Sequence, residues 1–84
     1  MKKITCSHHA IEQMEERGAT KNEVETAIAK GERVPAKRGR IAFRFNFQYN
    51  AKWGGREFAM KQVMPVVVEE NDEYVVVTVY TFYF

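Results

Sequence analysis

From residue 40 to residue 50 the chain reads RIAFRFNFQYN, with a large apolar residue at every second position. This period of two is typical of a β-strand with one buried face, because successive side chains point to opposite sides of a sheet. Two further strands are expected over residues 58–69 and 74–84, which are rich in β-branched and aromatic residues. Pro65 indicates a bulge or an edge position in the first of these strands. The last strand is expected at the centre of the sheet, covered on both faces for part of its length.

Upstream of residue 40 the apolar residues recur at helical spacing. One helix is expected over residues 8–17, because Ser7 is a favourable N-cap and Gly18 suits the left-handed position that ends a helix. A second helix is expected to begin after Thr20, which forms a capping-box pattern with Glu23, and to end at Gly31.

The order of these elements defines the expected fold class. Helix, helix, strand, strand, strand predicts an α+β fold, in which an N-terminal two-helix hairpin packs on one face of a three- to four-stranded antiparallel sheet. Residues 3–5 are expected to add a short edge strand. At 84 residues the chain has room for a single core, so residues 1–84 are expected to form one domain.

Composition limits the cellular compartment in which the protein is expected and the kinds of site that it can form. The single cysteine, Cys6, cannot form an internal disulfide, and no apolar run approaches the roughly 18 residues that span a membrane. A cytoplasmic protein without a membrane segment is therefore expected. No cofactor and no metal are expected, because His8 and His9 are the only histidines and adjacent helix positions diverge by about 100°.

The charge is unevenly distributed along the chain. The net charge is +2, but residues 30–65 contain nine basic and two acidic residues, whereas residues 66–84 contain four acidic residues and no basic one. Basic groups neutralise phosphates and aromatic rings stack on bases, so this basic, aromatic-rich segment suits single-stranded nucleic acid. The candidate nucleic-acid-binding residues in it are Arg38, Arg40, Arg44 and Arg56. In the alternative interpretation the phenylalanines belong to the core and the arginines form a solvated face.

A polar stripe on the first helix supplies the first catalytic candidates. His9, Gln13 and Arg17 lie one turn apart and therefore on one flank of the helix. An imidazole in the first turn lies near the positive end of the helix dipole, which favours the neutral form that a general base needs. In the alternative interpretation His9 and Arg17 only form structural hydrogen bonds or ion pairs.

The strands supply the remaining candidates. Thr78 and Tyr80 are expected on the sheet face away from the helices, which, given suitable strand pairing, places a hydroxyl and a phenol on the same open face as Arg44. Lys61 lies on the strand expected over residues 58–69, and the sequence does not determine which face of the sheet its side chain occupies. His9, Arg17, Lys61 and Tyr80 are the catalytic candidates, and Thr78 joins the nucleic-acid-binding set.

The opening SHHAIEQMEERG of residues 7–18, with VVVEE at 66–70 and VVTVY at 76–80, resembles a widespread family of small bacterial and phage proteins, the domain-of-unknown-function family 4258. The usual opening of that family is Ser-x-His-Ala-x-x-Arg-Met-x-x-Arg-Gly. His9 and Arg17 match it, whereas Gln13 stands where an arginine is common. The family in turn resembles the RelE- and barnase-like (BECR-fold) ribonuclease toxins, a resemblance that implies two helices on an antiparallel sheet and metal-independent RNA cleavage.

Together these observations predict a small toxin-like ribonuclease that acts on RNA, with His9 as the proton-transfer group and Arg17, Arg44 and Lys61 stabilising the charge on phosphorus. The alternative is a binding module without catalysis, whose basic strand contacts nucleic acid or an acidic protein. An antitoxin would be the expected protein partner of a toxin. The aromatic residues 80–84 predict a homodimer through the last strand, because a small monomer has little surface to cover them.

Overall fold

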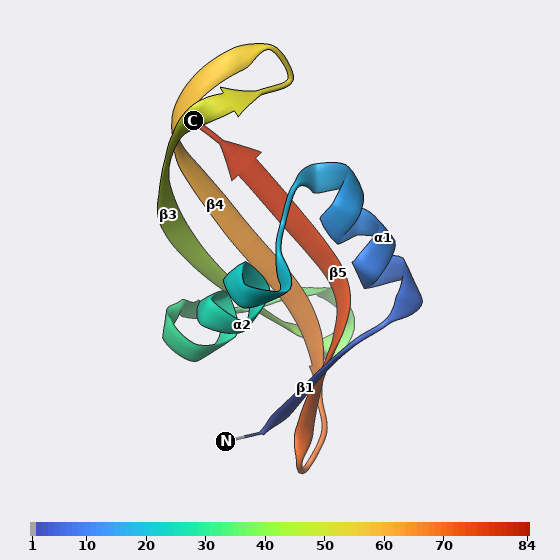
Figure 1. The fold of residues 1–84 in the computed structure, drawn as a ribbon. Coiled ribbons are helices and arrows are strands. Elements are labelled where there is room, and N and C mark those ends of the chain that lie inside the picture. Colours follow the sequence, from blue (N-terminus) through green and yellow to red (C-terminus); the bar gives the residue numbers. More distant parts are fainter. Residues whose placement is uncertain (1) are drawn as a thin grey trace.

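In the computed structural model, which describes residues 2–84, two helices lie on one face of a five-stranded mixed sheet (Figure 1). In chain order the elements are β1 (Lys3–Cys6), α1 (His8–Arg17), α2 (Lys21–Lys30), β2 (Glu32–Pro35), the 3-10 turn η1 (Lys37–Gly39), β3 (Ile41–Trp53), β4 (Arg56–Glu69) and β5 (Glu73–Tyr83). The strand order is β1-β5-β4-β3-β2. β1 runs parallel to β5, and the other neighbours are antiparallel.

The α+β class is confirmed, but the expected three- to four-stranded antiparallel sheet is wrong in two respects. β2 forms a second edge that was not expected, because ERVP has no apolar alternation; it pairs with β3 across the short turn of residues 36–40. β1 was expected as an edge strand, but its direction was not, because its neighbour β5 lies about 70 residues further along the chain. The sheet is therefore mixed.

The local signals placed both helices correctly. Ser7 Oγ accepts the N–H of Ala10 at the start of α1, and Gly18 ends α1 with φ 77°. At the start of α2, Thr20 and Glu23 each accept the other's main-chain N–H, which completes the capping box.

The helices do not form a closely packed pair. α1 packs on β5, whereas α2 packs on β3 and β4, so the two helices cover different strands (Figure 1). The core between the helices and the sheet includes Ala10, Val24, Val63, Val67, Val76 and Val79, all with no exposed surface. Fully burying one valine contributes about 1.5–3 kcal/mol, so this layer supplies much of the stability. Neither helix reaches the length and apolarity of a membrane span in the part of the chain that is described.

Irregularities in the strands shape the sheet. Pro65 lies in β4, the middle strand, and pairs with Val79, so the prediction of an edge position is wrong. The β4–β5 register does shift nearby, between Val66 and Val67, but the extra residue, Val77, belongs to β5. A second shift, between Gln48 and Ala51, coincides with φ 48° at Asn50. β5 is an internal strand, but its outer side has no neighbouring strand beyond Val76.

Candidate functional site

The helices leave one face of the sheet uncovered, and alternation along β5 decides which side chains lie on it. The hydroxyls of Thr81 and Tyr83 both donate to the main-chain oxygen of Arg17, so these two residues face the helices. Thr78, Tyr80, Phe82 and Phe84 therefore lie on the opposite, open face.

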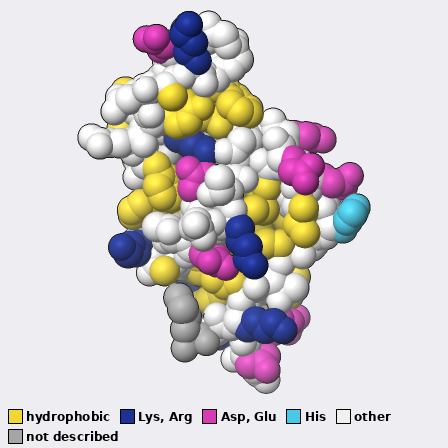
Figure 2. Space-filling view, viewed as in Figure 1, with side chains coloured by type: hydrophobic (Ala, Val, Ile, Leu, Met, Phe, Trp, Pro, Cys, Tyr) yellow, Lys and Arg dark blue, Asp and Glu magenta, His cyan; other side chains and the backbone are white. Residues whose placement is uncertain are grey.

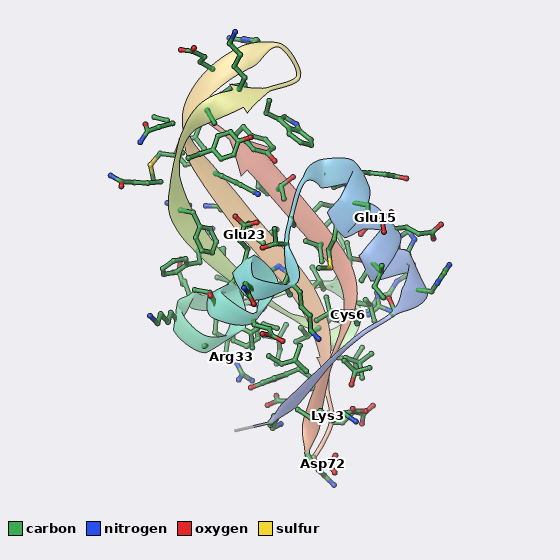
Figure 3. All side chains as sticks on the ribbon, in the orientation of Figure 1. Lys3, Cys6, Glu15, Glu23, Arg33 and Asp72 are labelled. Carbon is green, nitrogen blue, oxygen red and sulfur yellow. The ribbon has the colours of Figure 1, made fainter. Side chains whose placement is uncertain are left out.

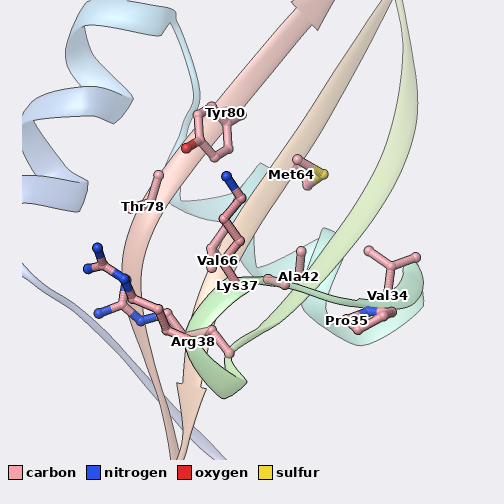
Figure 4. A pocket seen from close by; sticks show the side chains of 11 residues that line it. Val34, Pro35, Lys37, Arg38, Ala42, Met64, Val66, Thr78 and Tyr80 are labelled. Carbon is pink, nitrogen blue, oxygen red and sulfur yellow. The ribbon is translucent and has the colours of Figure 1, made fainter.

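A groove of about 440 Å³ crosses this open face (Figure 4). Its floor consists of the strand residues Val34, Ala42, Met64, Val66, Thr78 and Tyr80. Its wall is the end of β2 and the turn that leads to β3, formed by Pro35, Ala36, Lys37, Arg38 and Arg40. The groove thus combines a mainly apolar floor with a cationic rim.

The cations of the rim have no acidic partner. Within residues 2–84, Lys37, Arg38 and Arg40 form no salt bridge. Arg38 adopts the left-handed conformation with φ 62°, which is unfavourable for a residue with a Cβ, and Gly39 follows with φ 71°. This sharp turn places three positive side chains next to one another beside the groove.

Aromatic side chains extend the open face along β5. Tyr80, Phe82 and Phe84 are 41%, 47% and 57% exposed, and the Tyr80 and Phe82 rings are stacked with centroids 6.4 Å apart. We call these three residues the aromatic row. Because Tyr80 also lines the groove, the row begins where the groove ends.

Arg17 and Gln13 bind the outer edge of β5. The Arg17 guanidinium donates to the Val79 carbonyl at 2.7 Å, and the Val79 N–H donates to Gln13 Oε1 at 2.9 Å. The two side chains thus replace a neighbouring strand at this residue. The guanidinium of Arg17 also lies 5.2 Å from the centroid of the Tyr80 ring, which brings two of the predicted catalytic residues together.

Lys61 lies on the other face of the sheet, beneath the turn between the helices. It is 4% exposed, and its ammonium donates to the Gly18 carbonyl and, at 2.8 Å, to the carboxylate of Glu23. Figure 3 labels Glu23 on α2. The rings of Tyr49 and Tyr83 lie 5.7 and 5.9 Å from it. These contacts neutralise the carbonyl end of α1 and hold it to the start of α2. The ammonium group of Lys61 therefore has a structural role.

Tyr83 takes part in the same cluster. Burial raises the pKa of its phenol, so the hydroxyl stays protonated and keeps donating to the Arg17 carbonyl at 2.8 Å. The Trp53 ring stacks on Tyr83 at a centroid distance of 5.0 Å. The carboxyl end of α1 is thus enclosed by polar donors and aromatic rings.

The remaining candidates lie apart from the groove. His9 is exposed in the first turn of α1 and does not line the groove. Arg44 pairs with Glu32 at 2.7 Å, and Arg56 lies over the Phe58 ring beside the β3–β4 turn, at the opposite end of β3 from Arg40. The structure therefore brings together Thr78, Tyr80, Arg38 and Arg40, with Arg17 beside them, and leaves His9, Lys61 and Arg56 elsewhere.

Three residues of the open face were not among the sequence-based site candidates. Lys37 belongs to the same basic segment as Arg38, but its place on the groove depends on the η1 turn. Phe82 and Phe84 follow Tyr80 at a spacing of two, and that spacing was the signal that could have identified them.

The helix-covered side of the molecule has a different surface. Figure 2 shows basic and acidic side chains interspersed there with apolar patches. Across the described chain, no group of three His, Cys, Asp or Glu side chains is arranged to hold a metal ion.

Comparisons with known proteins give one relationship. Neither the curated proteins nor the solved structures contain a match to this chain. A family model described as "Domain of unknown function (DUF4258)" matches residues 6–81. Since the match covers nearly the whole chain, the protein belongs to this family of domains of unknown function.

Proposed function

We propose that the protein binds single-stranded RNA across the open face of the sheet. The observation that carries the proposal is the position of Lys37, Arg38 and Arg40, three cations without a salt bridge among residues 2–84, on the same face as the exposed aromatic row. Proteins that bind single strands combine a positive groove for the backbone with aromatic rings on which bases stack.

The cationic rim suits the sugar-phosphate backbone. Basic side chains that already neutralise carboxylates, as Arg44 does with Glu32, have less to gain from a phosphate. Lys37, Arg38 and Arg40 have no such partner within residues 2–84, so phosphates would supply their counter-charge.

The aromatic row suits unpaired bases. Phe82 and Phe84 are about half exposed, which is costly in water unless their rings serve a ligand or a partner. Stacking of one base on an aromatic ring contributes about 1–3 kcal/mol and tolerates any base. A strand that follows β5 would place bases on the row and phosphates at the rim.

Fluorescence anisotropy with a labelled oligouridine of about twelve nucleotides tests the proposal. Binding is expected to weaken with salt. The triple variant Lys37→Ala, Arg38→Ala, Arg40→Ala is expected to make the negative slope of log K against log salt shallower by about 2. Phe82→Ala is expected to weaken binding by about 1 kcal/mol at every salt concentration.

The matched control is Lys30→Ala, which removes an exposed cation from the end of α2 on the helix-covered side. Its affinity is expected to stay within twofold of the parent protein. Equal losses from Lys30→Ala and Arg38→Ala would show that net charge, and not the open face, determines binding, and would overturn the proposal.

Cleavage of the bound RNA is a second candidate, favoured by the phenol of Tyr80 in the groove. Metal-independent cleavage needs a group that exchanges protons with the ribose or the leaving oxygen, and cations that stabilise charge on the phosphate. Incubation of the same RNA followed by a denaturing gel tests this candidate. Cleavage products that disappear with Tyr80→Phe but persist with His9→Ala would support this candidate. RNA that stays intact with the parent protein would contradict cleavage and leave RNA binding as the only proposed function.

A further inference from the structure

We propose that two copies of the chain associate through the outer edge of β5, pairing residues 81–84 antiparallel about a twofold axis at Phe82. The proposal starts from the hydrogen-bond pattern between β4 and β5. Met60 and Phe84 exchange both main-chain hydrogen bonds, at 2.8 and 3.1 Å. Because such pairs alternate along an antiparallel ladder, the main-chain groups of Val79, Thr81 and Tyr83 point outward, away from β4.

The outward main-chain groups of these three residues differ in their hydrogen-bond partners. Val79 is bonded by Gln13 and Arg17 of α1. The main-chain N–H and C=O groups of Thr81 and Tyr83 have no partner within residues 2–84. A short stretch of open strand edge therefore begins where the helix side chains stop.

The other two edges of the sheet carry groups that oppose pairing. β2 contains Glu32, Arg33 and Pro35, and β1 begins with Lys3. The side chains of residues 77–84, which comprise the second half of β5 and Phe84, include no charged group and no proline. An uncharged, aromatic edge without such protection is a surface that pairs with another strand.

A second copy is the occupant that this edge fits. With Thr81 placed opposite Tyr83 of the copy, Phe82 faces Phe82, and Tyr80 faces Phe84. Every cross-strand pair on the open face is then aromatic, an arrangement that stabilises antiparallel strands, and no like charges meet. A twofold contact of this kind is self-complementary by symmetry.

The axis stands perpendicular to the sheet, so the open faces of both copies lie on the same side. The two aromatic rows would then join into one continuous surface with a cationic groove at each end. That this surface binds RNA rests on the function proposed above. The pairing itself follows from the edge alone, and its test uses no RNA.

Light scattering coupled to size-exclusion chromatography tests the association. The parent protein is expected to have twice the mass of the chain at micromolar concentration. Phe82→Lys places two ammonium groups opposite each other and is expected to be a monomer, whereas the control Phe82→Val stays dimeric. Circular dichroism of each variant checks that the fold is kept, since Phe82 is 47% exposed.

A mixing experiment tests the register. Phe82→Glu is also expected to be a monomer, but an equimolar mixture with Phe82→Lys is expected to restore the dimer, because residue 82 of one copy lies opposite residue 82 of the other. A parent protein with the mass of one chain up to about 200 µM would overturn the proposal. A dimer that Phe82→Lys leaves intact, or a mixture that stays monomeric, would overturn the twofold axis at Phe82.

Discussion

The two faces of the sheet use their cations in different ways. On the helix-covered side Lys61 donates to a carbonyl and a carboxylate, and at the edge of β5 Arg17 donates to a carbonyl. On the open side Lys37, Arg38 and Arg40 form no salt bridge within residues 2–84. The difference teaches that Lys61 and Arg17 are structural because a helix terminus or a strand edge needs their N–H groups, whereas Lys37, Arg38 and Arg40 are available for a ligand because no carboxylate among residues 2–84 pairs with them.

The largest expected effect is on stability, from Lys61→Met. The variant leaves the Gly18 carbonyl without its donor and removes the cation that pairs with the Glu23 carboxylate, so the free energy of unfolding is expected to fall by about 3 kcal/mol. Urea denaturation measures it. Lys52→Met, at an exposed position, should change stability by less than about 0.5 kcal/mol. Similar small losses from both variants would contradict a structural role for Lys61.

Gly18→Ala should cost about 2 kcal/mol, since the residue has φ 77° and a Cβ there would lie 2.7 Å from Trp53 Cζ3 and Tyr83 Oη. Gly39→Ala is the matched control, because Gly39 has φ 71° but open space around it. It should cost about 1 kcal/mol, from the backbone alone. Equal costs for the two variants would mean that the packing of Trp53 and Tyr83 around the end of α1 adds nothing.

A smaller effect on stability is expected when the pH is lowered, and it arises from Glu69 at the end of β4. Hydrogen bonds from Lys2 and then Arg33 hold the pKa of Glu69 below its ordinary value of 4.5. The ionised carboxylate therefore stabilises the fold above that pH, and the contribution is lost as the pH falls through the lowered pKa. Melting temperatures of Glu69→Gln and the parent protein should differ at pH 7 and converge towards pH 3. Glu57→Gln, which removes a carboxylate with no salt bridge within residues 2–84, should not reproduce this convergence.

The smallest effect on stability is expected on the open face. In Arg38→Gly the free energy of unfolding should stay equal or rise by up to about 1 kcal/mol, because glycine adopts φ 62° without steric cost. Affinity for oligouridine should fall in the same variant. Arg38→Ala, which keeps the backbone strain, should weaken binding without gaining stability. A loss of more than about 1 kcal/mol on Arg38→Gly would place Arg38 with the structural cations.

Local sequence was sufficient for the two helices, the three long strands and the facing of Thr78 and Tyr80. Ser7, Gly18 and the Thr20–Glu23 box act within one turn of their helix, so both helices could be predicted from neighbouring residues. The alternation along β5 likewise indicated that Thr78 and Tyr80 share a face. The role of Lys61 could not be predicted, because its partners, Gly18 and Glu23, lie some forty residues away in the chain.

The amino-acid sequence by itself determined the two helices, the three long strands and the concentration of positive charge between residues 30 and 65, since each follows from interactions among near neighbours. Tertiary structure decided the pairing of β1 with β5, the added edge β2, and which cations remain without a carboxylate. The physical reason is that the β1–β5 pairing and ion pairs such as Arg33–Glu69 join residues distant in the chain, so their partners exist only once the sheet has assembled. β2 lies near its partner β3, but without an apolar alternation only the pairing itself makes it a strand.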